Sequence, residues 1–226
     1  MLKNSRILTI IVAIGLVLYT FARITGLLVP YKVVSSANEP TLKVESLIWS
    51  SNFKSPQLFD FISFKSFDRV NNKEGVFIYR LCGMPGDKIE IRDAVLYING
   101  KDVDKSLNLA FCYKVTSNKA IILKDDNIIS PFDSYNFGLD SACVFLSAKQ
   151  LEEANLLQLQ KDILPKTVTD NYVKKVFNND WNPDQFGPIT VPQNHFFVLG
   201  DSRRNAEDSR YIGFIAKEKI IGTLLF

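Results

Sequence analysis

The sequence is poor in the residues that most metal, thiol and nucleic-acid sites require. Its 226 residues include one histidine and three cysteines, with no CxxC pair and no zinc-ligand spacing. Its 27 Lys and Arg residues exceed the 24 Asp and Glu residues by too little to indicate nucleic-acid binding. We therefore expect no metal, no cofactor and no nucleic-acid partner. With 46% hydrophobic and 23% charged residues, the composition is that of a folded domain.

The cysteines leave two possibilities open. If the domain is exported, Cys112 and Cys143 can pair, because oxidising compartments preserve disulfides. Alternatively, these two and Cys82 are three free thiols, because free cysteine is among the most often buried residues. The sequence alone does not decide between the two.

Long hydrophobic runs are absent after residue 30, and a single one precedes it. Residues 7–22 carry no charge, Arg23 follows, and residues 24–29 are again mostly apolar. As one helix, residues 7–29 would span roughly 34 Å at about 1.5 Å per residue, enough to cross a bilayer. We expect this run to be a transmembrane anchor.

The flanking residues predict how the anchor is oriented. Lys3 and Arg6 precede the apolar run, which favours a cytoplasmic N-terminus (residues 1–6). We therefore predict a single-pass protein of the cytoplasmic (inner) membrane, with its main domain on the outer, periplasmic side. A cleavable signal peptide is the alternative, because residues 35–37 (SSA) resemble a small-x-small cleavage site. The apolar run is, however, longer than the usual core of about 7–15 residues.

Beyond the anchor, the pattern is mainly β. Short apolar or alternating runs, separated by turn residues, predict strands at residues 47–49, 59–64, 76–80, 88–91, 95–98, 189–191, 195–199 and 220–226. MPGDK (residues 84–88) contains Pro and Gly and predicts a turn. Asn99-Gly100 lies between two strand-like flanks and predicts a hairpin.

The middle of the chain has a different character. Charged residues and Asn increase over residues 102–182, and residues 147–161 (SAKQLEEANLLQLQK) show helical periodicity. Ser147 with Gln150 forms a capping box at its start. We predict a small α+β subdomain at 102–182, inserted between the two parts of a β core, residues 30–101 and 183–226.

Four segments occur in an order that resembles the type I signal peptidases, membrane-anchored serine proteases that remove signal peptides from exported proteins. They are the anchor, SSANEPTL (35–42), YRLCGMPGDKIEI (79–91) and GDSRRNAEDSRYIGF (200–214). The last resembles the family pattern GDNRxNSxDSRYxG at Gly200, Asp201, Arg203, Asn205, Asp208, Ser209, Arg210, Tyr211 and Gly213. The resemblance covers most of the chain and implies a core of coiled antiparallel β-sheets.

The resemblance also implies a serine nucleophile and a neutral lysine base, but this chain has neither at the corresponding positions. In the family pattern S-G-S-M-x-P-T-L, Ser35 matches the serine that contributes to the oxyanion site, and Ala37 falls at the nucleophile. Tyr79 falls at the lysine of K-R-x-x-G-x-P-G-D. Ala206 replaces a serine that bonds this lysine. Because nucleophile and base act as a unit, three such losses together predict a site without peptidase chemistry.

Other motif residues remain. Asp201, Arg203, Asp208, Ser209 and Arg210 match the family pattern. Asp and Arg side chains form strong charge-assisted hydrogen bonds, so we expect this set to brace the backbone of the site. The fold is thus expected to be retained without its chemistry.

Several interpretations in which other residues supply the catalytic groups stay open. Ser36, beside the vacant position, could act as a displaced nucleophile, although in an extended segment its side chain would point to the opposite face from Ala37. A Tyr79 base is disfavoured because a buried phenol stays protonated at neutral pH. We expect His195 to cap a strand or lie on the surface, and Lys32 or Lys43 to serve as base only with unusual loops. A laboratory Ser-to-Ala change would explain Ala37 alone.

Three functions follow as hypotheses. The first is a protein of the export pathway that lacks peptidase activity and binds signal peptides or exported proteins in the retained groove. The second is an active signal peptidase that cuts after small residues at positions −3 and −1, using Ser36. The third is a structural subunit with a membrane protein partner. Trp49, Phe53 and Phe59 are candidates for contact with membrane lipid, with burial in the core as the alternative.

Overall fold

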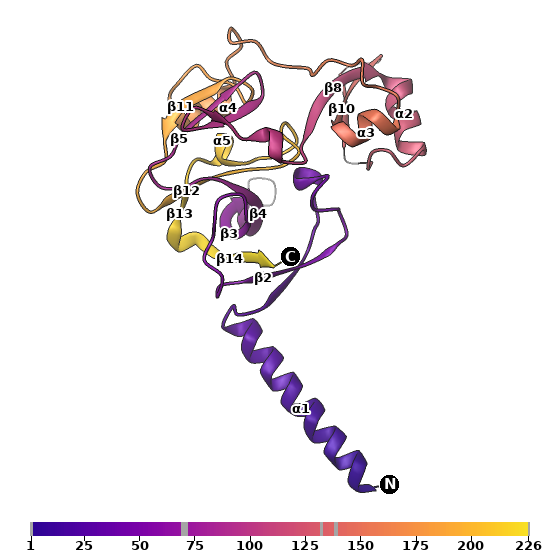
Figure 1. Ribbon diagram of the computed structural model, residues 1–226, viewed down its shortest axis with the longest axis vertical. Coiled ribbons are helices and arrows are strands. Elements are labelled where there is room, and N and C mark those ends of the chain that lie inside the picture. The colour runs from indigo at the N-terminus through magenta and orange to yellow at the C-terminus, as the bar shows by residue number, and fades with distance from the viewer. Residues whose placement is uncertain (1, 69–71, 132, 138–139, 226) are drawn as a thin grey trace.

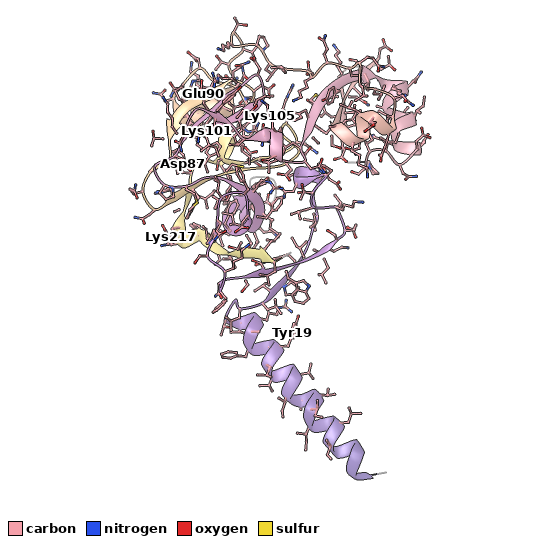
Figure 2. The ribbon with its side chains drawn as sticks, viewed as in Figure 1. Tyr19, Asp87, Glu90, Lys101, Lys105 and Lys217 are labelled. Carbon is pink, nitrogen blue, oxygen red and sulfur yellow. A yellow bond between two sulfur atoms is a disulfide. The ribbon has the colours of Figure 1, made fainter. Side chains whose placement is uncertain are left out.

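The chain folds into a β-rich body from which one long helix projects (Figure 1). The computed structural model describes residues 2–68, 72–131, 133–137 and 140–225. Helix α1 (Leu2–Ile24) includes an apolar stretch, Ile7–Ile24, of mean hydropathy 2.3 that is not buried against the rest of the chain. Figure 2 shows its side chains, including Tyr19, directed away from the helix axis into the surroundings. By length and composition, this helix can cross a membrane.

The helix predicted over 7–29 is present, but both of its ends differ: it begins at Leu2 and ends before residue 29. It stops at Ile24, because Gly26 adopts a positive φ of 77° and the chain turns into strand β1 (Val29–Lys32). The side chain of Asn52 donates a hydrogen bond to the Thr25 carbonyl (2.7 Å). The end of the helix is thereby tied to the β body.

The largest sheet has seven strands, and all its pairings are antiparallel. Its order is β1-β2-β14-β3-β4-β12-β13. The strands after β1 are β2 (Leu47–Ser51), β3 (Phe61–Asp68), β4 (Lys73–Gly83), β12 (His195–Leu199), β13 (Ile215–Ala216) and β14 (Ile220–Leu225). The C-terminal strand β14 lies between β2 and β3, so both ends of the β core meet in one sheet (Figure 1). Of the predicted strand 220–226, Phe226 lies outside the described residues.

A second antiparallel sheet has the order β11-β5-β6-β7. It comprises β11 (Phe186–Thr190), β5 (Lys88–Arg92), β6 (Val95–Ile98) and β7 (Lys101–Asp102). The predicted hairpin is confirmed: Asn99 and Gly100 link β6 to β7 with φ of 51° and 78°. Two successive positive φ values suit Asn-Gly and match the twist of the strands.

The third sheet, β8-β10-β9, lies to one side of the others with two short helices (Figure 1). Its elements are β8 (Ala110–Thr116), α2 (Ser117–Asp125), β9 (Ser134–Phe137), β10 (Ser141–Ser147) and α3 (Ala148–Glu153). Helix α4 (Asn171–Phe177) follows, and short helical turns are η1 (Ser36–Asn38), η2 (Asp104–Ser106), α5 (Ser209–Ile212) and η3 (Lys217–Lys219). The observed fold is mainly antiparallel β, as predicted.

The helix predicted over 147–161 is wrong beyond its first turns. The capping box of Ser147 and Gln150 is present, but α3 ends at Glu153 and Asn155 takes a positive φ of 53°. The chain turns there because Leu151 and Leu156 both pack into the core of the third sheet. Helical periodicity in this segment reflected burial on one side rather than a continuous helix.

Cys112 and Cys143 form a disulfide between β8 and β10, with their Cα atoms 5.8 Å apart. Cys82 is a free and fully buried thiol in the core beneath β4 and β5. Of the two alternatives that the sequence left open, the structure therefore has the paired one.

Candidate active-site groove

A groove of about 480 Å³ runs between the segment after β1 and the strand β4. One wall consists of residues 31–35, 37, 38 and 42, the other of residues 75–79, and Asp68, Asn205 and Glu207 complete the lining. Among the predicted site residues, Ser35, Ala37 and Tyr79 line this groove. Three motif segments far apart in the sequence thus meet at one concavity.

The segment that carries Ala37 is a helical turn and not an extended strand. Residues Ser36–Asn38 form the turn η1, which the Glu39 amide closes by donating to the Ser36 carbonyl (3.0 Å). The Ser202 amide donates to the Ala37 carbonyl (3.1 Å). The turn is therefore held directly by the last motif segment.

The expectation that Ser36 lies in an extended segment is wrong, because Ser36 begins the turn η1. Its side chain is buried and, unlike Ser35 and Ala37, it is not part of the groove lining. Its hydroxyl accepts a hydrogen bond from the Asn205 amide (2.8 Å) and also bonds the carboxylate of Asp133. Ser36 is thus held in a buried polar network with Asp133 and with Asn205, which itself lines the groove.

The three altered positions come together in space. Ala37, Tyr79 and Ala206 belong to one buried hydrophobic cluster, whose other members include Phe196 and Val198. Their exposed fractions are 6%, 5% and 8%. The positions to which the resemblance assigns a nucleophile, a base and a supporting hydroxyl thus belong here to one apolar cluster.

Tyr79 packs in this cluster as an aromatic side chain. Its ring lies 6.1 Å from that of Phe64 and 6.4 Å from that of Phe77, between centroids. Burial raises the pKa of its phenol well above the usual value, and the nearby carboxylates of Asp208 and Glu207 raise it further. The phenol therefore stays protonated at neutral pH and cannot take a proton from a nucleophile.

The predicted bracing residues are buried and paired. Asp208 accepts from the Arg210 guanidinium (2.7 Å to Nη2) and from the Gly200 amide (3.0 Å). The Ser209 hydroxyl accepts from the Val198 amide at 2.9 Å. Burial opposes the charge of Arg210, but the carboxylate of Asp208, its hydrogen bond to the guanidinium and the nearby Asp184 raise the pKa of Arg210, so this pair stays ionised. These bonds hold the loop after β12 in one conformation.

Asp201 and Arg203 have partners that the sequence did not reveal. The Asp201 carboxylate accepts two bonds from Arg80 (Nε 2.7 Å, Nη2 2.6 Å) and one from the Thr41 hydroxyl (2.5 Å). Arg203 is paired with Asp104 at 2.6 Å. Thr41 lies in SSANEPTL and Arg80 in YRLCGMPGDKIEI, so the motifs themselves could have indicated the partners of Asp201. Asp104 lies outside every motif, so no sequence signal indicated the partner of Arg203.

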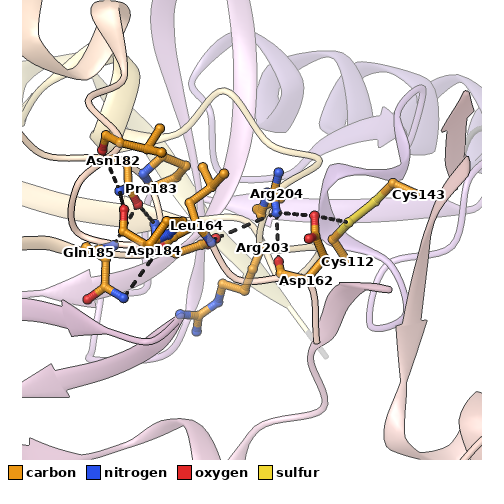
Figure 3. Close-up of polar contacts among 12 residues, drawn as sticks. Cys112, Cys143, Asp162, Leu164, Asn182, Pro183, Asp184, Gln185, Arg203 and Arg204 are labelled. Carbon is orange, nitrogen blue, oxygen red and sulfur yellow. Dashed lines mark hydrogen bonds and ion pairs between the residues drawn. A yellow bond between two sulfur atoms is a disulfide. The ribbon is translucent and has the colours of Figure 1, made fainter. Parts of the chain in front are cut away.

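Arg204, which no pattern singled out, joins the loop to the segment after the third sheet. Its guanidinium donates to the Asp162 carbonyl (2.7 Å) and carboxylate (3.0 Å), and lies 3.7 Å from the Asp184 carboxylate. The backbone of Asp162 in turn donates to the Cys112 carbonyl (2.9 Å). Figure 3 shows the contacts of Arg204 with Asp162 and Asp184, and the Asp162 side chain beside the Cys112–Cys143 disulfide.

The remaining candidates lie outside a catalytic arrangement. The His195 ring Nδ1 contacts the Gln193 carbonyl (2.9 Å) at the start of β12, in line with the predicted strand-end position. Lys32 lies at the groove but forms an ion pair with Glu45, and Lys43 is exposed.

The three aromatic candidates for lipid contact differ in how exposed their side chains are. Phe53 is 88% exposed, in the segment after β2 that is tied to the end of α1. Trp49 is half-buried, and Phe59 packs against the core.

Comparison with known proteins agrees with the motifs. The family model described as "Signal peptidase, peptidase S26" matches residues 4–226. Signal peptidase I of Buchnera aphidicola subsp. Baizongia pistaciae is 28% identical over 222 residues, covering 87% of this chain and 68% of that protein. Signal peptidase I S of Bacillus subtilis is 29% identical over 166 residues (71% and 58%). Probable signal peptidase I-2 of Synechocystis sp. is 22% identical over 196 residues (84% and 58%).

The chain spans 58% to 68% of the length of these relatives. A crystal structure of a signal peptidase I from Enterococcus faecalis overlaps with 76% of this chain and 98% of that one, at 26% identity and a TM-score of 0.36. Because the family model covers nearly the whole sequence, this chain belongs to the peptidase S26 signal peptidase family. The resemblance inferred from the motifs is thereby confirmed.

Proposed function

We propose that this protein is a signal-peptidase-like membrane protein of the export pathway that binds signal peptides or exported proteins without cutting them. One observation carries the proposal: Ala37, Tyr79 and Ala206 meet in a buried apolar cluster beside an open groove. Peptide hydrolysis by an alcohol needs a hydroxyl and a group that takes its proton. Neither is present where the family has them.

The open groove is the reason to propose binding rather than a purely structural role. Residues 75–79 of β4 line it, and β4 pairs with β12 only from Arg80 onward. Within the described residues, this part of β4 therefore pairs with β3 alone. The groove lies beside residues 75–79. An extended peptide can add to such a strand edge by main-chain hydrogen bonds.

The location and partners are part of the same proposal. The apolar helix Ile7–Ile24 crosses the cytoplasmic membrane once, with the N-terminus inside and the β body outside. Phe53, the most exposed of the three aromatic candidates, reaches the lipid surface. A membrane protein partner is compatible with this arrangement.

The test is cleavage of a preprotein by the purified full-length protein in detergent. It is run with the unaltered protein, with Ser36→Ala, with the double change Ala37→Ser and Tyr79→Lys, and with that double change plus Ala206→Ser. We expect no turnover by the unaltered protein, and turnover in the triple change, because it restores the hydroxyl, the base and its hydrogen-bond partner.

Each outcome has a different consequence. Turnover by the unaltered protein that disappears in Ser36→Ala would establish a displaced nucleophile and overturn the proposal. A labelled signal peptide that fails to bind the unaltered protein would instead favour the structural-subunit hypothesis. Serine-directed acylating inhibitors serve as an independent check, since they should not react with the unaltered protein.

A further inference from the structure

Asn38 places a polar side chain in the wall of the groove, at the position where the family pattern has methionine. The residue lines the groove and is 4% exposed. Its side-chain Nδ2 donates to the Ile78 carbonyl at 2.6 Å. This bond fixes the orientation of the amide, because a flip would set Oδ1 against the Ile78 oxygen.

The other end of the same amide is unsatisfied. Asn38 Oδ1 is buried and has no hydrogen-bond partner among the residues that the structure describes. A buried acceptor without a donor costs free energy, and such groups in native proteins call for an explanation. A methionine at this position would incur no such cost, so the asparagine is unfavourable for the empty fold alone.

The location of Asn38 indicates what would satisfy this buried oxygen. Asn38 follows Ala37 directly and contacts Ile78, so it bridges the two walls between which an extended peptide would lie. A hydroxyl on a small side chain is a donor that can reach into a narrow groove floor. An apolar side chain of the same size would leave the oxygen unpaired.

We propose that Asn38 Oδ1 accepts a hydrogen bond from the bound peptide, and that the groove prefers a peptide with Ser or Thr over an apolar isostere beside Ala37 and Asn38. This inference rests on the proposed function, since it names the kind of peptide that the groove selects. A site built around an unpaired acceptor discriminates against a ligand that lacks the donor.

The experiment changes the peptide first and the protein second. Fluorescent signal-peptide segments carry Ser or 2-aminobutyrate, which have nearly the same size, at position −1 or −3. Their Kd values for the full-length protein in detergent are measured by anisotropy. We expect the Ser peptide to bind about tenfold more tightly at one of the two positions, which corresponds to one satisfied buried acceptor.

The protein variants locate the effect. Asn38→Met should remove the preference for Ser, or reverse it in favour of 2-aminobutyrate, because the acceptor is replaced by an apolar side chain. Asn118→Met, at an exposed position in α2, is the matched control and should retain the preference. Thermal melting of both variants checks that they fold.

The possible failures are distinguishable. Equal binding of the Ser and 2-aminobutyrate peptides to the unaltered protein at both positions overturns the inference and leaves the proposed function intact. A preference that persists in Asn38→Met also overturns it, because the acceptor must then be another group. If no peptide binds, the proposed function fails and the inference falls with it. The peptide comparison uses the unaltered protein, so its outcome does not depend on the folding of a variant.

Discussion

The carbonyl oxygen of Ala37 lies where a side chain on Gly200 would have to be. A Cβ atom built on Gly200 would be 2.5 Å from that oxygen and 2.4 Å from the Cβ of Ala206. Real Cβ atoms do not approach other atoms so closely, so the turn η1 and the loop after β12 can meet only across a glycine. This close approach brings the motif SSANEPTL (35–42) against the motif GDSRRNAEDSRYIGF (200–214).

Gly200→Ala should therefore destabilise the protein. The added methyl group forces the Ala37 turn and the Ala206 loop apart, and we expect a loss of about 1–3 kcal/mol in the free energy of unfolding. Thermal or urea unfolding in detergent measures it. Gly75→Ala is the control, because a Cβ there would meet its nearest neighbour at 3.5 Å, an ordinary contact. Equal effects of the two changes would contradict the packing argument.

Asp201→Asn should destabilise the protein more than the loss of a surface ion pair does. Asp201 is almost fully buried and Arg80 is 11% exposed at its side chain, so the change leaves a nearly buried guanidinium without its counter-charge. We expect a loss of about 3 kcal/mol. Glu74→Gln breaks the exposed pair with Lys219 and should cost less than about 1 kcal/mol. Urea unfolding midpoints of both variants decide whether burial governs the difference.

Counting thiols tests the cysteine arrangement. The native protein should present no reactive thiol, because Cys82 is buried and burial raises its pKa to about 12. Denaturation should expose one thiol, and denaturation with reductant should expose three. In Cys82→Ser the counts after the same treatments should be zero and two. Three thiols in denatured, unreduced protein would support the alternative without a disulfide.

Loss of the disulfide should lower stability through the unfolded chain. Cys112 and Cys143 are 31 residues apart, and a loop of that length contributes about 3–4 kcal/mol in the chain-entropy account. The double change of both cysteines to alanine should shift the unfolding midpoint accordingly. Cys82→Ala is the comparison for the loss of a buried thiol without a cross-link, and a similar shift in both would argue against the cross-link as the cause.

The phenol of Tyr79 should make stability depend on pH in the alkaline range. Burial raises its pKa in the folded protein, whereas in the unfolded chain it titrates near 10. Below about pH 10 both states keep the proton and the contribution is complete. Above that pH the unfolded chain releases the proton first, so stability falls as pH rises.

Tyr79→Phe isolates this effect. The decrease in the urea midpoint between pH 8 and pH 11 should be smaller in the variant than in the unaltered protein. Tyr172→Phe, at a side chain that is 63% exposed, controls for the substitution itself. An identical decrease in Tyr79→Phe and the unaltered protein would show that another group is responsible.

Local patterns were sufficient for much of the fold. The N-terminal helix, most strands of the two larger sheets, the Asn99-Gly100 hairpin and the capping box at Ser147 follow from periodicity and turn chemistry over a few residues, whereas the strands of the third sheet were not predicted. Helix ends were less predictable: α3 stops at Glu153 because of packing between Leu151 and Leu156, which no local rule contains. The predicted boundaries of the inserted subdomain remain a prediction.

Motif order and spacing alone predict that Ala37, Tyr79 and Ala206 occupy the catalytic positions of the family pattern. They also indicate the family, which is confirmed, and an apolar N-terminal helix, which the structure contains. The tertiary structure adds that these three side chains belong to one buried cluster, that the Ser36 hydroxyl bonds Asn205, and that the Asn38 oxygen has no donor among the described residues. Those features depend on contacts between segments up to 169 residues apart, such as that of Ser36 with Asn205. Such contacts arise from the packing of the whole domain and leave no local trace in the chain.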